Sequence, residues 1–491
     1  MPQETKHINF LWCSLAGLRC LRVVPVHTMY DKKRVDQYAD IDENGYLKWL
    51  PKPMPSVSLS RACISLPAHE DTPSPDSGVP FVGDICLQLE DPMSNLMCLP
   101  WRPKHFMGAV RMLDPISHAP WSLCPRSCLA RILEKAQARH GISFRVGFEL
   151  EFALATIDGK FDDRHTYSSA RGFDVESSLL DDLCDTLYSM GIVVEQLHKE
   201  SAPGQFELVL GHLPAMEAVD GLLLAREAVA AVAYRHQRRV TLLPKFLPEY
   251  AGNGCHVHLS LWKNGINILS LSGATIRPGS LDGVLDMYTT LSGFSSLNET
   301  FRQFLGGLVA LLPALMCFTT PTPNSFRRLQ PGAWAGAFQG WGIANKEVPL
   351  RLPVQTLEDG LFTNVEVKLC DSTANPHIAL AAILSAGLVG VDLAATLSEA
   401  DFAESFAALP APLDVDPGQL TYAERTRRKI KELPREWSTA KACLMSPEGK
   451  GLRELLGEDM VRACVAIRES EWAALGGIRL EEEIDLLFDR Y

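Results

Sequence analysis

The stretch FRVGFELEFAL, residues 144–154, alternates apolar and charged side chains with the period of a β-strand. Side chains in a strand point to the same face every second residue, so the aromatic and aliphatic residues share one face. Glu149 and Glu151 then share the other face. A single pair of this kind is often the solvated face of an edge strand, but the continuous apolar flank favours a buried sheet. Two carboxylates held there are costly unless a cation lies beside them.

Two further segments place functional side chains at the same spacing. His256 and His258 follow a glycine-rich turn in GNGCHVHLSLW, and Glu366 and Lys368 lie in NVEVKL. Carboxylates with one imidazole suit hard divalent ions such as Mg²⁺ or Mn²⁺. For one histidine, a hydrogen-bonded core residue is the alternative. Two histidines on one face favour one metal ligand and one nucleotide contact.

A turn brings the third pair of carboxylates together. Glu200 and Glu207 flank the sequence PGQ at residues 203–205, although two exposed glutamates are an equal alternative. Carboxylates held close together repel unless a proton or a metal lies between them. With the pairs above, this pattern predicts a multi-metal site for a phosphate-bearing substrate.

Arginines are the second group of candidate ligands. Arg327 and Arg328 in NSFRRLQPG are expected in a loop, where they either clamp an anion or remain solvated. Arg351, in the apolar strand LRLPV, must be paired or contact an anion. The sequence has no Walker-type G-x-x-x-x-G-K-[ST] loop and no G-x-G-x-x-G motif. Metals and arginines would therefore hold the phosphates.

Composition narrows the class of protein. A chain of 491 residues is long enough for two or more domains, and its formal charge of −12 disfavours nucleic acid or an anionic membrane as main partner. The N-terminal residues lack a signal-peptide pattern, so a cytoplasmic location is expected. The apolar runs at residues 304–318 and 378–391 are shorter than the ~20 residues of a membrane span and are predicted to be core helices.

Strand-like and helix-like segments alternate along the chain, which indicates an α+β fold. The first hundred residues are rich in predicted strands, with a turn at Asn44 and Gly45, and charged helices after residue 410 are expected to be peripheral. The predicted helices cover residues 126–140, 175–190, 214–232, 281–292 and 297–312 and a segment that begins at Pro376. The principal predicted strands cover residues 144–154, 240–246 and 256–262 and the sequences LRLPV and NVEVKLC.

Seven motifs occur in a characteristic order: GFELEF, VEQLHKESAPGQFE, LLPKF, GNGCHVHLSLW, NSFRRLQPG, NKEVPLRLP and NVEVKLCDSTANPHIALAAILSAGL. In this order they resemble the glutamine synthetase family from about residue 10 to residue 391. The resemblance implies a small N-terminal β-grasp-like domain, residues 1–105, and a large catalytic domain, residues 106–491. In the latter, helices flank a barrel-like antiparallel sheet. It also implies a large homo-oligomeric ring with active sites between neighbouring subunits.

The resemblance further implies ligands for ATP and for two or three Mg²⁺ or Mn²⁺ ions. One ion would be held by Glu151, Glu200 and Glu207, and another by Glu149, His256 and Glu366. The nucleotide would contact His258, Ser260, Arg351 and Asn364, and the amino-acid substrate would contact Gly252, His256, Arg328 and Lys368. The implied reaction transfers the γ-phosphoryl group of ATP to a substrate carboxylate, after which an amine attacks the acyl phosphate.

Several positions depart from the family pattern. Trp334 stands where ammonia-using members have a glutamate, and Lys346, Lys368 and Asn364 each replace an arginine. An indole offers an apolar and cation-π surface for an amine larger than ammonia. Arg328, Trp334 and Lys346 are therefore the predicted catalytic set of a ligase that forms a γ-glutamyl or related amide, similar to the divergent FluG-type branch. Two alternatives are glutamine synthetase proper and a non-catalytic scaffold or signalling protein.

Overall fold

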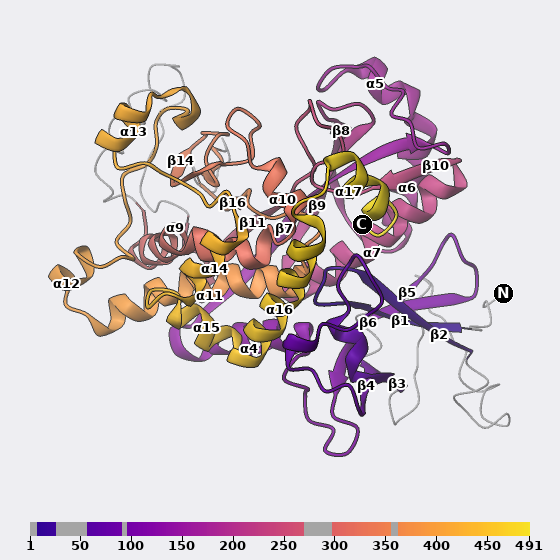
Figure 1. Cartoon of the computed structure of the whole chain (residues 1–491), viewed down its shortest axis with the longest axis horizontal. Helices are drawn as coiled ribbons and strands as arrows, with labels where there is room; N and C mark the ends of the chain where they lie inside the picture. The colour runs from indigo at the N-terminus through magenta and orange to yellow at the C-terminus, as the bar shows by residue number, and fades with distance from the viewer. Residues whose placement is uncertain (1–6, 26–55, 91–95, 270–296, 355–361) are drawn as a thin grey trace.

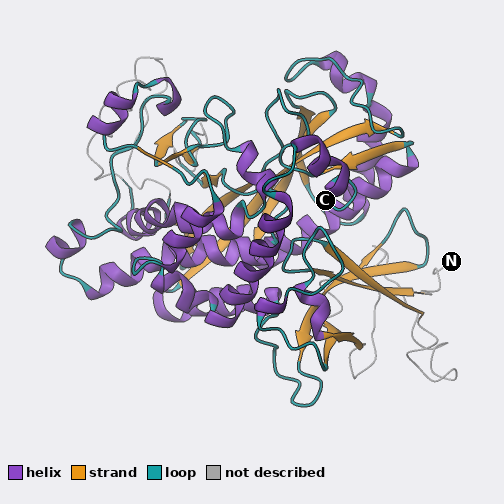
Figure 2. Cartoon of the chain, viewed as in Figure 1, coloured by secondary structure: helices purple, strands orange, loops and turns teal. Residues whose placement is uncertain are grey.

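Two β-sheets from different parts of the chain organise the fold, and helices pack around the larger one (Figures 1 and 2). The computed structural model describes residues 7–25, 56–90, 96–269, 297–354 and 362–491. The predicted turn at Asn44 and Gly45 and the predicted helix at residues 281–292 lie outside these residues. The predicted α+β class is confirmed.

The N-terminal sheet has strands in the order β2-β1-β6-β4-β3, with β5 paired to β6. Strands β1 and β6 are parallel, and the other pairs are antiparallel. The division at residue 105 stays a proposal, and the sheet itself continues to the end of β6. Its strands are β1 (His7–Cys13), β2 (Arg19–Pro25), β3 (Ser56–Ser60), β4 (Asp84–Leu89), β5 (Met97–Cys98) and β6 (His105–Leu113).

The large sheet has the order β14-β15-β16-β11-β7-β9-β8, with β10 paired to β7 and β12 to β11. It is antiparallel except for the β14–β15 pair. Its strands are β7 (Ile142–Thr156), β8 (Val194–Lys199), β9 (Gln205–Pro214), β10 (Arg238–Thr241), β11 (Cys255–Lys263), β12 (Ile266–Asn267), β14 (Trp341–Ile343), β15 (Leu350–Leu352) and β16 (Val365–Val367). The predicted strand at residues 240–246 therefore ends early, at Thr241.

Helices border the large sheet. α7 packs on β7 and β9, while α9 packs on α11 and α14. α4 begins with a proline and ends at Gly141, whose φ of 65° suits a glycine C-cap. The helices after the N-terminal sheet are α4 (Pro125–His140), α5 (Ala170–Val175), α6 (Ser177–Ser189), α7 (Ala215–Arg235), α9 (Glu299–Thr319), α10 (Pro323–Arg328), α11 (Pro376–Thr396), α12 (Glu399–Ala403), α13 (Tyr422–Arg427), α14 (Trp437–Met445), α15 (Lys450–Leu456), α16 (Glu458–Leu475) and α17 (Leu480–Leu487).

The two apolar helices are longer than the sequence runs indicated. α9 and α11 each have 21 residues and are long and apolar enough to cross a membrane, but most of each helix is buried inside the fold. Pro313 lies within α9 instead of ending it. Both helices are core elements, as predicted, because their apolar surface is covered by other helices and by the sheet.

Two expectations about the C-terminal half are wrong. Arg327 and Arg328 lie in α10 and not in a loop, because Thr322 and Ser325 form a capping box that starts a short helix. The C-terminal helices are also not peripheral, since α16 contributes buried residues to the main core. In α16 the buried Arg468 donates to the backbone oxygens of Leu15 and Thr373, both at 3.2 Å, and thereby connects three distant segments.

Candidate active site

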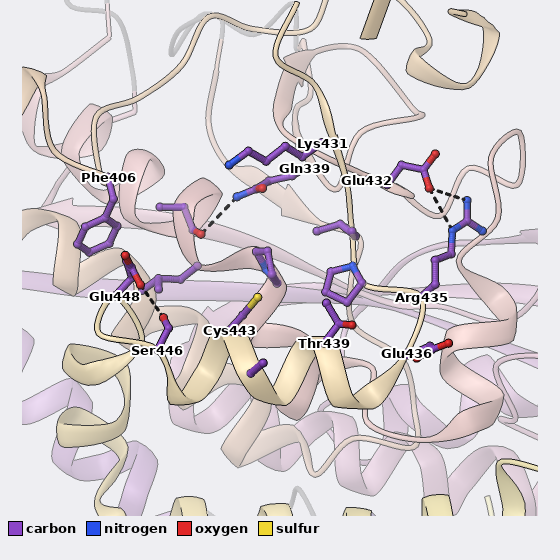
Figure 3. A pocket seen from close by; sticks show the side chains of 17 residues that line it. Gln339, Phe406, Lys431, Glu432, Arg435, Glu436, Thr439, Cys443, Ser446 and Glu448 are labelled. Carbon is purple, nitrogen blue, oxygen red and sulfur yellow. Dashed lines mark hydrogen bonds and ion pairs between the residues drawn. The ribbon is translucent and has the colours of Figure 1, made fainter. Parts of the chain in front are cut away.

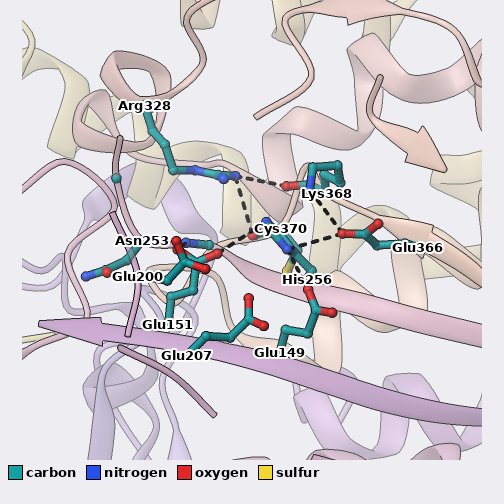
Figure 4. Close-up of polar contacts among 12 residues, drawn as sticks. Glu149, Glu151, Glu200, Glu207, Asn253, His256, Arg328, Glu366, Lys368 and Cys370 are labelled. Carbon is teal, nitrogen blue, oxygen red and sulfur yellow. Dashed lines mark hydrogen bonds and ion pairs between the residues drawn. The ribbon is translucent and has the colours of Figure 1, made fainter. Parts of the chain in front are cut away.

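Strand pairing places the predicted metal ligands on one face of the large sheet (Figure 4). On the two sides of β7, Glu149 pairs in register with His256 of β11, and Glu151 pairs with Glu207 of β9. On the far side of β11, Glu366 of β16 pairs with His258. Residues more than 200 positions apart thus face one space, with Glu149 near its centre.

Glu149 is shared by the two histidines. Its Oε2 lies 2.9 Å from His256 Nδ1, and its Oε1 lies 2.8 Å from His258 Nε2. His256 Nδ1 is also 3.3 Å from Glu366 Oε1. Ligand atoms within 4.8 Å of one another form two groups here, Glu149 with Glu207 and His256, and Glu149 with His258 and Glu366.

A third group lies at the turn between β8 and β9. His198 Nε2 is 3.1 Å from Glu200 Oε1 and 3.8 Å from Glu207 Oε1. These three residues also place ligand atoms within 4.8 Å of one another. Sequence reasoning missed His198, although it lies two residues before Glu200 and the two-residue spacing used elsewhere identifies it.

Glu151 lies beside these groups and is held by neutral donors. Its Oε2 accepts hydrogen bonds from Gln205 Nε2 at 2.9 Å and from the backbone N–H of Gly254 at 3.0 Å. His256 Nε2 lies 3.7 Å from its Oε1. Glu151 is therefore oriented toward the cluster before any ligand binds.

The pKa values of the glutamates reveal an excess of negative charge. Burial and the neighbouring carboxylates Glu149, Glu151 and Glu200 raise the pKa of Glu207 well above its usual value. Burial and Glu200 raise the pKa of Glu151 to about 7. A divalent cation relieves this repulsion as well as a proton does, so the donor set fits Mg²⁺ or Mn²⁺.

Near the histidines, hydrogen bonds and charges shift the pKa values in other directions. Burial opposes ionisation of Glu149, but hydrogen bonds from His256 and His258 lower its pKa. Burial disfavours the charged form of His258, yet Glu149 raises its pKa to about 9. Burial and Lys368 lower the pKa of His256, which favours the neutral imidazole that a metal requires.

Two cationic side chains contact the Glu366 carboxylate. Arg351 Nε lies 2.6 Å from Glu366 Oε2, and Lys368 Nζ lies 3.0 Å from Glu366 Oε1. Burial opposes ionisation of Glu366, but Lys368 and His256 hold its pKa at about 2. Arg328, which is 3% exposed, donates to the backbone oxygens of Lys368 at 3.0 Å and Cys370 at 3.4 Å (Figure 4).

The predicted nucleotide residues line one cavity. This cavity has a volume of about 850 Å³ and includes Glu149, His258, Ser260, Arg351 and Asn364 in its wall. Asn364 Oδ1 lies 2.9 Å from His258 Nδ1, and Ser260 Oγ accepts a hydrogen bond from Trp262 Nε1 at 2.9 Å. Gly252 does not line this cavity. A Cβ atom added at Gly252 would come within 1.7 Å of the Pro244 backbone oxygen, so only glycine fits there.

Aromatic side chains border the carboxylate cluster. Trp334 is 45% exposed, and its ring meets that of Tyr167 edge-on at 6.4 Å between centroids. Tyr167 also meets His198 edge-on at 5.7 Å, and Lys346 Nζ lies 6.0 Å from the centre of the Tyr167 ring. No sequence pattern distinguished Tyr167, which comes from the irregular segment before α5.

A carboxylate supports the Trp334 loop from behind. Trp334 has a φ of 53°, a left-handed backbone conformation that is unfavourable for a bulky residue. Burial and Asp416 raise the pKa of the Glu347 carboxyl, while the nearby backbone N–H groups of Trp334 and Gly332 act to lower it. The Glu347 carboxylate therefore lies against the strained backbone of the Trp334 loop.

A second large cavity lies away from this chemistry (Figure 3). It has a volume of about 940 Å³ and lies between α9, α14 and the segment around Lys431. Four of its charged lining residues belong to that segment, Lys431, Glu432, Arg435 and Glu436, and Glu448 follows α14. None of the predicted site residues lines it, so the smaller cavity is the candidate active site.

Comparison with known proteins places the chain among ATP-dependent ligases. Residues 122–280 and 282–485 match the family model of the glutamine synthetase catalytic domain. The chain is 34% identical over 368 residues to the gamma-glutamylpolyamine synthetase GlnA3 of Streptomyces coelicolor, covering 73% of the chain and 72% of that protein. It is 31% identical over 383 residues to the protein fluG of Emericella nidulans, covering 75% of the chain and 38% of fluG.

Solved structures share the fold. The crystal structure of a glutamine synthase homologue superposes with a TM-score of 0.76 at 23% identity, over 100% of the chain and 99% of the homologue. The chain therefore shares with this homologue a mixed α/β fold with a curved, half-barrel sheet.

Proposed function

The chain belongs to the glutamine synthetase family of ATP-dependent ligases, and from that premise we propose that it joins the γ-carboxyl group of glutamate to an organic amine. The observation that carries the proposal is the Tyr167–Trp334 aromatic pair beside the Glu200 and Glu207 carboxylates. Burial together with Glu200 and Glu207 raises the pKa of Tyr167, so the phenol and these carboxylates act on one another. Aromatic faces and carboxylates together recognise an alkylammonium ion better than they recognise ammonium.

The donor set fits divalent ions. His198, Glu200 and Glu207, whose ligand atoms lie within 4.8 Å of one another, would hold one ion with Glu151 beside them. Glu149 and Glu366, which lie 2.9 Å and 3.3 Å from His256 Nδ1, would hold another together with His256. The bound ions would neutralise the phosphates of ATP and the developing charge of phosphoryl transfer. His258, Arg351 and Asn364 line the adjoining cavity and would contact the nucleotide.

Protein groups would orient the two substrates. Arg328 and Lys368 lie together beside the cluster and offer positive charge to the carboxylates of glutamate. The alkylammonium ion must lose a proton before its nitrogen can attack. The protein carboxylates beside the aromatic pair, Glu200 and Glu207, would accept that proton. Tyr167 and Trp334 would cover the alkyl part of the amine and exclude water from the acyl phosphate.

One of the relatives supports the choice of amine. The protein of Streptomyces coelicolor is named a gamma-glutamylpolyamine synthetase, and the Trp334 position of this chain lacks the carboxylate expected for ammonium. We therefore place alkylamines, including diamines, ahead of ammonia as substrates. A homo-oligomeric ring and a cytoplasmic location remain part of the proposal.

A panel of three amines tests the function. Purified protein with glutamate, ATP and Mg²⁺ is given ammonia, n-butylamine or 1,4-diaminobutane, and ADP release and amide formation are measured. We expect amide formation with one or both organic amines and little with ammonia. Efficient use of ammonia supports glutamine synthetase proper instead. Nucleotide binding without amide formation from any of the three contradicts the ligase.

A non-catalytic scaffold is the second candidate. The Lys368–Glu366 and Arg351–Glu366 contacts favour it, because two cations already neutralise a carboxylate that a metal would need. The same panel decides between the two functions, since a scaffold binds nucleotide or metal without forming an amide.

A further inference from the structure

A buried lysine connects the Glu200–Glu207 hairpin to the segment that carries Tyr167. Lys199 ends β8 and is 1% exposed. Its Nζ donates to the backbone oxygens of Glu200 at 2.5 Å and Ala202 at 2.7 Å, and lies 3.1 Å from Asp163 Oδ2. All three donors of the ammonium group are thus used, so the side chain has one position.

Asp163 carries the connection to the other segment. Its Oδ2 also accepts the backbone N–H of Gly204 at 3.1 Å, and its Oδ1 accepts the backbone N–H of His165 at 2.8 Å. At the other end of this segment, Ser168 N donates to the Lys199 backbone oxygen at 2.9 Å. Residues 163–168 are therefore attached to the hairpin at both ends.

The attached segment presents Tyr167 to the site. Tyr167 precedes Ser168 and touches both His198 and Trp334 with its ring. Glu200 directly follows Lys199, and its backbone oxygen is one of the three acceptors of the ammonium group. The Lys199–Asp163 ion pair thus sets the position of the Tyr167 ring relative to the Glu200 carboxylate.

Stability gives a weak reason for such a pair. Two charges removed from water lose solvation that their attraction only partly restores, and apolar residues of similar size are often as stable. We infer that Lys199 and Asp163 are positioning residues that set the affinity of the enzyme for its amine substrate through Tyr167. This inference rests on the proposed function, because it assumes that the amine contacts Tyr167.

The test compares one substitution at two ion pairs. Asp163→Asn removes the charge that pairs with Lys199 and changes few atoms. Asp220→Asn is the matched control, because Asp220 pairs with the equally buried Arg126 and neither residue belongs to the site. KM and kcat are measured for n-butylamine and 1,4-diaminobutane, with KM for ATP as an internal reference.

We expect Asp163→Asn to raise the KM for both amines about tenfold, as misplacement of a binding group by a fraction of an ångström does. The KM for ATP is expected to stay within about twofold for both variants, and Asp220→Asn is expected to leave the amine KM unchanged. Equal effects of the two substitutions on the amine KM, or no effect of Asp163→Asn, would overturn the inference.

A double-mutant cycle separates positioning from general damage. In a Tyr167→Ala background, Asp163→Asn is expected to change the amine KM by less than about twofold, because the group that it positions is gone. The same tenfold effect in that background contradicts action through Tyr167. If Asp163→Asn does not fold, Asp163→Asn with Lys199→Met removes the unpaired buried charge and is read in the same way. If the wild type forms amide from neither amine, the proposed function fails and the inference fails with it.

Discussion

Lys368 Nζ lies 3.0 Å from Glu366 Oε1, and both side chains are buried. A proposed metal ligand is therefore paired with the ammonium group of a residue that follows its strand, β16, which ends at Val367. Arg351 reaches the other oxygen of the same carboxylate at 2.6 Å. The Glu366 carboxylate is thus neutralised by cations of the protein itself, whereas the carboxylates around Glu207 carry uncompensated negative charge.

Removing the Lys368 charge is expected to strengthen metal binding. In Lys368→Met the ammonium group no longer competes for Glu366, so the Kd for Mn²⁺ at the weaker site should fall about tenfold. Titration calorimetry of the metal-free protein measures this change. Lys450→Met is a control, because Lys450 is exposed and contacts only Glu454 among the acidic residues of the described chain. An unchanged Kd in Lys368→Met would show that Lys368 does not limit metal binding.

The Trp334 position is expected to decide between ammonia and larger amines. Trp334→Glu introduces a carboxylate beside Tyr167, which attracts ammonium and removes apolar contact with an alkyl chain. We expect kcat/KM for ammonia to rise about tenfold and that for n-butylamine to fall by a similar factor. Trp334→Phe keeps an aromatic face and serves as the control. If Trp334→Glu and Trp334→Phe behave alike, the indole does not select the amine.

Glu347 is expected to act by holding the Trp334 loop. Its carboxylate lies near the backbone N–H groups of Gly332 and Trp334, so Glu347→Ala removes the negative charge beside a backbone whose φ at Trp334 is 53°. We expect the KM for n-butylamine to rise about fivefold with the KM for glutamate unchanged. Glu347→Gln retains an acceptor oxygen and should lie nearer to the wild type. Steady-state kinetics with each substrate varied in turn gives both constants.

The raised carboxyl pKa values predict how stability depends on pH. The pKa of Glu151 is about 7 in the folded protein and 4.5 as its ordinary value, so the folded form binds the proton more tightly. The stability of the metal-free protein should therefore fall as pH rises from about 4.5 to about 7. Thermal unfolding in a chelator at several pH values measures this slope.

A variant isolates the contribution of Glu151 from that of other groups. Burial lowers the pKa of His256, so this group makes stability rise with pH, opposite to Glu151. The informative quantity is therefore the difference in stability between wild type and Glu151→Gln at each pH. Glu151→Gln should gain stability relative to the wild type as pH rises. In saturating Mn²⁺ the wild type should be more stable than Glu151→Gln, because the metal binds the ionised carboxylate. The same pH slope in both metal-free proteins would contradict the assignment.

Local patterns predicted the elements well where their cause was local. The two-residue period placed Glu149 and Glu151 on one strand face, and Gly141 marked the end of α4. The short helix α10 was missed because its start depends on the side chains of Thr322 and Ser325 bonding to backbone groups. The buried position of α16 was missed because its charged residues, Arg468 and Glu471, find partners on distant segments.

Sequence by itself determined which residue types face the site. The carboxylates and imidazoles repeat at strand spacing, and their order along the chain carries the family resemblance. It did not determine which of them share an ion, because that depends on the register between strands far apart in sequence. Only the tertiary structure brought Tyr167 and the Lys199–Asp163 pair to the site. Period two gives the face of a strand, whereas long-range pairing and loop packing decide the neighbours on that face.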